Sequence, residues 1–388
     1  MKTGIYFDNN ATTRVAPEVV EAMMPYFREE YGNPSSPHGF ARKPAMAVAA
    51  ARDSVARLIG ARADQVVFTS GGTESNVMAL WGWLSPGSTR TEVVMSAVEH
   101  ASVWAWRDRL TAAGYTVRVV PVNRAGALDM EALAGLLSER TAWVSVMLAN
   151  NETGVMYPLK RISEMAHAVG AKVHTDAVQA VGKIPLNLTS LGVDSAALCG
   201  HKYHASKGIG VLYLRDPAGF APLWVGGEQE FGRRPGTEPV ALVAGLGCAS
   251  DLAEAWLMAR GADAMASARD AMEAWLTATI SDMVVLGKNE ARLPNTTMVL
   301  IRRVETEPLL ALLDMEGIAC SSGSACASGA HEVSHVVRAM GWADEAAAVL
   351  RISASRYTQP EDYERLREVL PKAVARLRGT VSLDAAGG

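Results

Sequence analysis

The chain has 388 residues, of which 20% are charged and 49% hydrophobic, and its net charge is −4 at neutral pH. This balance gives no electrostatic case for binding nucleic acid or an anionic membrane surface. No apolar run is long enough to span a bilayer, and the start, MKTGIYFDNNATT, lacks the apolar core of a signal peptide. We therefore expect a cytoplasmic protein of two or three domains, with neither nucleic acid nor a membrane as a partner.

Apolar runs alternate with helix-like segments over the first two thirds of the chain. Several runs are continuous, which is typical of strands covered on both faces. This order predicts an α/β domain with a mainly parallel, seven-stranded sheet. The predicted strands are 65–70, 92–98, 116–122, 142–148, 172–177, 195–200 and 210–214, and the predicted helices between them include 74–84, 101–113, 129–138 and 159–169.

An alanine-rich helical stretch over about 239–280 follows and suits a connector between domains. Three shorter strands and a final helix that begins at Pro360 predict a smaller α+β domain. We expect the large domain to cover 15–258 and the small domain to combine 1–14 with 259–388. The last residues, GTVSLDAAGG, read as a disordered tail.

Polar residues follow the predicted strands, and ligands of open α/β sheets bind beyond the carboxyl ends of the strands. The first strand is followed by SGGTES (70–75), whose glycines at a helix start form a candidate anion site, although an ordinary glycine turn is the alternative. Later strands are followed by His100, by ANNETGV (149–155), and by Asp176 with Gln179. The run CGHKYHASKGIG (199–210) then supplies His201, Lys202 and His204.

An anion cradle, a carboxylate and a lysine at one sheet edge are what pyridoxal phosphate needs. The cradle holds the phosphate, the carboxylate keeps the pyridine nitrogen protonated, and the lysine forms a Schiff base. A nicotinamide site would show an early GxGxxG motif, and this sequence has none.

Eleven motifs in order, from residue 6 to about 358, carry a family resemblance: YFDNNATTRV, YGNPSSPH, FTSGGTES, VEH, ANNETGV, HTDAVQAVGK, LCGHK, GRRPGTE, RLPNTT, SSGSACASG and RISASRYT. In them the sequence resembles the cysteine desulfurases of the NifS/IscS type, in the class V aminotransferase group of fold-type I pyridoxal phosphate enzymes. The resemblance is strongest to the nitrogen-fixation NifS branch.

The resemblance implies a role for each matching residue. Lys202 binds pyridoxal 5'-phosphate covalently, Asp176 pairs with its pyridine nitrogen, and Gln179 contacts its phenolic oxygen. His100 stacks on the ring and acts as an acid and base. The phosphate is held by Gly72, Thr73, Cys199 and His201, together with Thr237 of a neighbouring subunit, which implies a homodimer. The substrate set is Asn151 (which also contacts the cofactor), Arg356 and Asn33, and a structural role for Arg356 at a strand end is the alternative.

Cys326, in SSGSACASG, is the nucleophile that the resemblance implies. It takes the sulfur of L-cysteine as a persulfide and releases L-alanine. The loop at about 321–331 then delivers the sulfur to an iron–sulfur scaffold of the NifU type, with nitrogenase maturation as the expected use. Small residues predict a mobile segment at 322–330. No structural metal site is expected, and a transient contact of Cys326 with a cluster stays open.

Two other classes of function stay open. A selenocysteine lyase or another class V aminotransferase-like enzyme would share the cofactor site, and a non-catalytic scaffold that binds sulfur or clusters would need no cofactor. Cys320 is an extra thiol six residues before Cys326, and either an inert buried role or a redox role is open for it. Whether the Cys199 side chain, a weak donor, contacts the phosphate is also open.

Overall fold

A computed structural model describes residues 4–84, 88–323, 333–343, 345 and 347–384, with side chains described as far as residue 379. Its largest sheet has seven strands in the order β2-β8-β7-β6-β5-β3-β4. Only β8 is antiparallel to its neighbours, so the predicted mainly parallel sheet is confirmed. The strands are β2 (Val66–Thr69), β3 (Glu92–Ser96), β4 (Thr116–Val120), β5 (Thr141–Ser145), β6 (Lys172–Asp176), β7 (Ser195–Cys199) and β8 (Gly210–Leu214).

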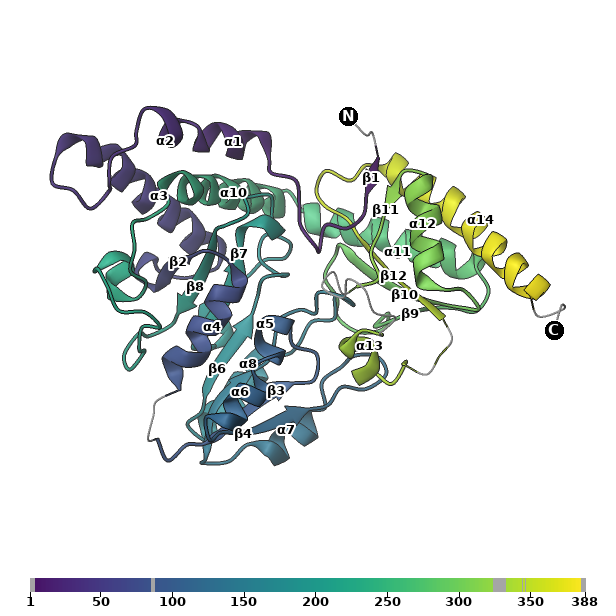
Figure 1. The fold of residues 1–388 in the computed structure, drawn as a ribbon, viewed down its shortest axis with the longest axis horizontal. Coiled ribbons are helices and arrows are strands. Elements are labelled where there is room, and N and C mark those ends of the chain that lie inside the picture. The colour runs from purple at the N-terminus through teal and green to yellow at the C-terminus, as the bar shows by residue number, and fades with distance from the viewer. Residues whose placement is uncertain (1–3, 85–87, 324–332, 344, 346, 385–388) are drawn as a thin grey trace.

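Helices cover both faces of this sheet (Figure 1). Neighbouring residues of a strand point to opposite faces, and each face packs into its own buried apolar cluster. Phe68 belongs to the cluster that contains α3 (Arg42–Leu58), α8 (Leu159–Ala168) and α10 (Val240–Met258). Val67 belongs to the cluster beneath α4 (Gly72–Trp83) and α6 (Arg107–Ala112). Burial on both faces explains the continuous apolar runs of the sequence.

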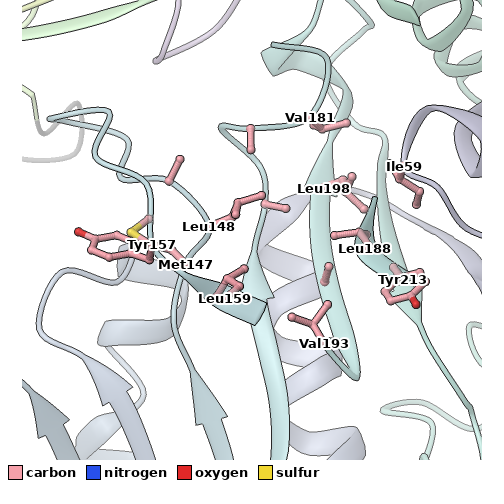
Figure 2. Packing of buried hydrophobic residues seen from close by; sticks show 14 of the residues in the cluster. Ile59, Met147, Leu148, Tyr157, Leu159, Val181, Leu188, Val193, Leu198 and Tyr213 are labelled. Atoms are coloured by element: carbon pink, nitrogen blue, oxygen red, sulfur yellow. The ribbon is translucent and has the colours of Figure 1, made fainter. Parts of the chain in front are cut away.

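Figure 2 shows part of the first cluster, including Leu148, Leu159, Leu188 and Leu198. These four side chains are at most 4% exposed. Burial of each contributes roughly 1.5–3 kcal/mol to the free energy of folding. The cluster thus anchors the loops that follow β5 and β7, which carry the polar residues of interest.

A second body is built on a three-stranded antiparallel sheet (Figure 1). Its strands are β9 (Met283–Val285), β10 (Thr296–Arg302) and β12 (Ala347–Ser353), and its main helices are α11 (Gly261–Thr279), α12 (Thr306–Met315) and α14 (Pro360–Asp384). Near the N-terminus, β1 (Ile5–Tyr6) pairs with β11 (Ile318–Ala319), which attaches the start of the chain to this body. The domain limits 15–258 and 1–14 with 259–388 stay a prediction.

The remaining helices are short. They are α1 (Pro17–Met23), α2 (Pro25–Arg28), α5 (Ala101–Trp104), α7 (Met130–Leu136), α9 (Leu188–Leu191) and α13 (His335–Ala339), together with the single 3-10 turns η1 (Gly39–Ala41), η2 (Ala63–Gln65), η3 (Gly200–Lys202) and η4 (Gln229–Gly232).

Three segments differ from their predictions. The segment 101–113 divides into α5 and α6. The segment 239–280 divides into α10 and α11, because Arg260 adopts a left-handed conformation with φ of 59°. The tail is helical to Asp384 rather than disordered from 379, since an established helix extends at small cost per residue.

The helix α10 is, within the described ranges, the one helix that is long and apolar enough to cross a membrane. It packs against α3 and α1. Its apolar side chains Val243 and Leu246 are buried in the cluster on that face of the sheet. A place in the protein core therefore accounts for its composition.

A buried ion pair gives a stability prediction for the second body. Arg292 donates to both carboxylate oxygens of Glu273 at 2.8 Å, and both side chains are almost fully buried. Replacing Glu273 with alanine leaves Arg292 unpaired, so the free energy of unfolding should fall by about 3–5 kcal/mol in a urea titration. Asp263→Ala, which removes an exposed pair with Arg260 on the same helix, should change it by less than about 1 kcal/mol. Equal effects of the two substitutions would contradict this reading.

Candidate active site

A cavity of about 560 Å³ lies at the carboxyl ends of the large sheet's strands, where the second body meets them. Residues of the N-terminal segment, of the sheet edge and of the second body line it. Nine predicted site residues are among them: Gly72, Thr73, His100, Asn151, Asp176, Gln179, Cys199, His201 and Lys202.

The start of α4 forms one wall of the cavity. Backbone N–H groups in the first turn of a helix have no partner within the helix and favour an anion. A Cβ on Gly72 would lie 2.7 Å from Cγ2 of Val178 and 3.6 Å from Cβ of Cys199. Glycine is therefore needed here for the helix start to approach the neighbouring loops.

Lys202 ends the turn η3, directly after β7. Its Nζ donates to the backbone carbonyls of Asn10 (2.6 Å) and Ala11 (2.7 Å). Burial lowers the pKa of Lys202 to about 8, and the positive charge of Arg351 acts in the same direction. A substantial fraction of this amine is therefore neutral, and nucleophilic, near physiological pH.

Asp176 is the last residue of β6 and is 4% exposed. Its Oδ2 accepts from Nδ2 of Asn76 (2.8 Å), and its Oδ1 accepts from the backbone N–H of Val178 (3.0 Å). His100 precedes α5, and its Nδ1 is 2.8 Å from the hydroxyl of Ser102. Both predicted side chains are thus held by neighbours that the sequence analysis did not single out.

Gln179 lies against a second buried lysine. Its Oε1 accepts from Nζ of Lys183 (2.7 Å), and its Nε2 donates to the carbonyl of Asn10 (3.0 Å). Burial lowers the pKa of Lys183 well below the usual value for lysine, and the charge of Lys202 adds to this effect. The carbonyl of Asn10 is thus shared by Gln179 and Lys202.

Arg351, on β12, lines the cavity and was not predicted as a site residue. Its Nη1 donates to the carbonyl of Gly323 (2.6 Å), and its Nη2 donates to Oδ1 of Asp8 (2.7 Å). Its Nε has no hydrogen-bond partner among the described residues.

Glu152 also lines the cavity and was not predicted. Its Oε1 accepts from the hydroxyl of Ser334 (2.8 Å), whereas its Oε2 is buried without a partner among the described residues. Burial raises the pKa of Glu152 to about 7. The cavity therefore contains a carboxyl group that exchanges a proton near neutral pH.

Four predicted residues are not placed in this cavity. Arg356 lines a much smaller pocket of about 20 Å³ that shares Lys202 with it, and its Nη2 is buried without a described partner. Asn33 and Thr237 line neither pocket, and Thr237 is exposed. Cys326 lies outside the described residues, as does most of the predicted mobile segment 322–330.

The other three cysteines, Cys199, Cys248 and Cys320, are free thiols. Burial raises the pKa of Cys320 to about 12, so this thiol is protonated at neutral pH and a poor nucleophile. Burial also raises the pKa of Cys199. Within the described ranges, no group of three or more His, Cys, Asp or Glu side chains is arranged to hold a metal ion.

Comparison with known proteins places the whole chain in one family. The model of the family "Aminotransferase class-V" matches residues 5–366. The cysteine desulfurase NifS of Azotobacter vinelandii is 46% identical over 376 residues, which are 96% of this chain and 93% of that protein. A cysteine desulfurase of Cereibacter sphaeroides is 48% identical over 379 residues, which are 96% of each chain.

A solved structure of a NifS-like protein has the same fold, with a TM-score of 0.87 and 32% identity over 98% of this chain and 100% of that one. The predicted fold-type I architecture and the predicted family are therefore both confirmed. The chain belongs to the class-V aminotransferase family, in the group of the NifS-type cysteine desulfurases.

Proposed function

We propose that this chain is a pyridoxal-phosphate-dependent cysteine desulfurase, which converts L-cysteine to L-alanine and transfers the sulfur to Cys326. The observation that carries the proposal is one cavity that holds an amine of lowered pKa (Lys202), a buried carboxylate (Asp176) and a glycine cradle at a helix start (Gly72). The relatives at 46% and 48% identity, named as cysteine desulfurases, support it.

The residues of the cavity fit pyridoxal 5'-phosphate. The start of α4 suits its phosphate, because N–H groups in the first turn of a helix favour an anion and Gly72 lets this helix start lie against Val178 and Cys199. Asp176 suits a protonated pyridine nitrogen, and the partly neutral Lys202 suits covalent attachment to an aldehyde. The residues that would hold the group are Gly72, Thr73, His100, Asn151, Asp176, Gln179, Cys199, His201 and Lys202, with Thr237 of the partner subunit.

The protein's own residues divide the work of the reaction. When bound, the cofactor supplies an electron sink for negative charge at the substrate Cα. Lys202 takes the proton from that carbon, and His100 exchanges the proton of the substrate thiol. The thiolate of Cys326 attacks the substrate sulfur. Over the whole reaction, L-cysteine and the Cys326 thiol become L-alanine and a Cys326 persulfide, so that atoms and electrons balance.

Arg351 is the arginine that we propose for the substrate carboxylate, in place of Arg356. It lies in the main cavity beside Asn151, whose carbonyl accepts from its Nη1 at 3.1 Å. Its ion pair with Asp8 holds the guanidinium in position. The donors that it keeps for a substrate carboxylate are Nε, which has no partner among the described residues, and the second proton of Nη2.

Substitution with lysine distinguishes the two arginines. Arg351→Lys keeps the charge and can keep the ion pair to Asp8, but it loses the bidentate geometry. We expect KM for L-cysteine to rise by about tenfold to a hundredfold, which corresponds to roughly 1.5–3 kcal/mol for hydrogen bonds to a charged group. Arg356→Lys should leave KM within about threefold of the wild-type value. A larger rise in KM for Arg356→Lys would return the role to that residue.

We propose a homodimer from an exposed apolar patch formed by Phe27, Tyr31, Phe40 and Met46. These side chains are 60%, 72%, 66% and 64% exposed, and the rings of Tyr31 and Phe40 lie 6.1 Å apart. The patch follows α2 and the start of α3, away from the second body (Figure 1). Exposed large apolar side chains on neighbouring elements favour a protein interface, and the proposed contact of Thr237 with a phosphate requires a partner subunit.

Light scattering after size exclusion tests this interface. The wild-type protein should have about twice the 41.2 kDa mass of one chain. Phe40→Asp buries a charge in the interface and should give a monomer, because an unpaired buried charge is strongly unfavourable. Met315→Asp changes an even more exposed apolar residue, on α12, and should stay dimeric. A wild-type monomer would refute the dimer.

The use of the sulfur is a further part of the proposal. The resemblance to the NifS branch supports an iron–sulfur scaffold of the NifU type as the acceptor, in nitrogenase maturation. A cytoplasmic location agrees with this use and stays a prediction.

The visible spectrum of the purified protein before and after L-cysteine, with alanine quantified, tests the function. The proposal expects a coloured protein, a spectral change on addition and alanine release. Faster alanine release from L-selenocysteine than from L-cysteine would favour the lyase alternative. A colourless protein in which borohydride fixes nothing on Lys202 would favour a non-catalytic scaffold.

A further inference from the structure

We infer that Asn76 is a positioning residue, which orients the Asp176 carboxylate and, through the Ser102 hydroxyl, adds a second donor at Nδ1 of His100. The functional part of the inference rests on the proposed cofactor site, since Asp176 and His100 are the residues assigned to the cofactor ring. The hydrogen bonds themselves follow from the structure of the chain.

Asn76, on the second turn of α4, uses every polar atom of its side chain. Its Nδ2 donates to Oδ2 of Asp176 and to the hydroxyl of Ser102, both at 2.8 Å. Its Oδ1 lies 2.9 Å from Nε2 of His174. A carboxylate only accepts hydrogen bonds, so the amide must present Nδ2 to Asp176 and Oδ1 to His174.

The hydrogen bonds on the far side of His174 agree with this orientation of the Asn76 amide. Nε1 of Trp83 can only donate, and it donates to the hydroxyl of Ser195 (3.2 Å). That hydroxyl lies 3.0 Å from Nδ1 of His174 and keeps its own proton to donate there. Burial lowers the pKa of His174 to about 3, so the ring is neutral, with one donor and one acceptor. Nε2 therefore carries the proton and donates to Asn76.

Donors and acceptors are also fixed in the hydrogen bonds between Asn76, Ser102 and His100. The backbone N–H of Ser102 can only donate, and it donates to Nδ1 of His100 (3.1 Å). The Ser102 hydroxyl accepts from Asn76 and therefore points its own proton at the same Nδ1, 2.8 Å away. Two donors converge on Nδ1, which must be unprotonated. The neutral ring then carries its proton on Nε2, the ring nitrogen that these hydrogen bonds do not use.

The hydrogen bonds of Asn76 therefore fix which atoms donate and which accept at Asp176 and His100, the two groups that would contact a cofactor ring. Rotation of the Asn76 amide by half a turn would set its oxygen against the Asp176 carboxylate and its NH2 group against the proton of His174. Both contacts are repulsive in a buried site. The orientation of Asp176 and the hydrogen bonding at Nδ1 of His100 are therefore coupled through one amide.

Nitrogen NMR of the full-length protein labelled with ¹⁵N-histidine tests this coupling, with and without pyridoxal phosphate. His100→Gln and His174→Gln assign the two rings among the eight histidines. In the wild-type protein we expect both rings protonated on Nε2 and unprotonated on Nδ1. Ser163→Ala removes a buried hydroxyl from α8, outside these hydrogen bonds, and should change neither ring.

Two variants perturb the network at different points. In Asn76→Asp the new carboxyl group still accepts from His174 and shares one proton with the adjacent Asp176, so the Ser102 hydroxyl loses its donor and turns toward the new side chain. The His174 signals should be retained while the Nδ1 signal of His100 shifts, because Nδ1 loses one of its two donors and stays unprotonated through the backbone N–H of Ser102. Ser102→Ala should shift His100 alone. Alanine release should fall by about tenfold to a hundredfold in both variants, as for a misplaced reacting group.

A His100 ring protonated on Nδ1 in the wild-type protein would overturn the inference. So would unchanged His100 signals in both variants. If Asn76→Asp fails to fold by circular dichroism, Ser102→Ala still decides, because it removes only one hydroxyl. The expected NMR result without alanine release in the wild-type protein would refute the proposed function and leave the coupling standing.

Discussion

Replacing Lys202 with arginine should abolish alanine release, with kcat lower by at least about 10³-fold. Arginine keeps a positive charge near the carbonyls of Asn10 and Ala11, so the fold should survive. It cannot attach to an aldehyde, and its guanidinium does not lose a proton in the working pH range. The measurements are steady-state alanine release and recovery of borohydride-fixed cofactor on the peptide that contains residue 202.

Lys207→Arg is the matched control, because Lys207 lies five residues further on and is exposed. It should retain wild-type activity and the fixed cofactor. A Lys202→Arg protein that releases alanine at more than about one tenth of the wild-type rate would remove Lys202 from the mechanism.

The pH dependence of attachment follows from the lowered pKa of Lys202. Because burial lowers this pKa to about 8, the ammonium form predominates below pH 8 and the reactive amine above it. The rate at which the apoprotein binds pyridoxal phosphate covalently should therefore rise between about pH 7 and 9 and then level off. A rate still rising steeply above pH 10 would indicate a lysine with an ordinary pKa.

Replacing Cys326 with alanine has the second large expected effect. The protein should keep its visible spectrum and its spectral change with L-cysteine, because Lys202, Asp176 and His100 are untouched. It should form no protein persulfide, and alanine release should fall by at least about 10²-fold, since the nucleophile is lost.

Cys320→Ala is the matched control for Cys326→Ala. Burial raises the pKa of Cys320 to about 12, so this thiol is expected to carry no sulfur, and its loss should change neither alanine release nor the persulfide. Persulfide formation that persists in Cys326→Ala and disappears in Cys320→Ala would exchange the two roles.

Periodicity predicted the large sheet well because its strands are buried on both faces. The run 210–214 coincides with β8, and each of the other six predicted strands overlaps an observed one. The place of β8 between β2 and β7 could not be predicted, because pairing partners depend on contacts far apart in the sequence. The break at Arg260 was also not predicted, since a left-handed arginine leaves no mark in composition.

The cavity residues that sequence reasoning found lie directly after strands. Gly72, His100, Asp176 and Lys202 each follow or end a strand of the sheet, and their common edge follows from parallel pairing. The chemistry of a pyridoxal phosphate site predicted the roles of the cradle, the carboxylate and the lysine, and the motif resemblance supplied the role of His100.

Arg351 and Asn76 were not predicted as site residues, because their surroundings depend on residues far away in the sequence. Arg351 and Arg356 share the motif RISASRYT, but β12 ends at Ser353, so only Arg351 lies on the strand that lines the main cavity. Asn76 follows the glycine turn SGGTES and has no signature of its own. Its role depends on Asp176, 100 residues away in the sequence, and on the buried His174.

Transfer of sulfur from L-cysteine to Cys326 can be followed in one turnover of the wild-type protein without reductant. Alanine and the sulfur-bearing peptides are then quantified by mass spectrometry. We predict one alanine for each persulfide, with the added sulfur atom on the peptide of Cys326. Alanine formed without a persulfide on Cys326, or a persulfide confined to Cys199, Cys248 or Cys320, would contradict sulfur transfer to Cys326.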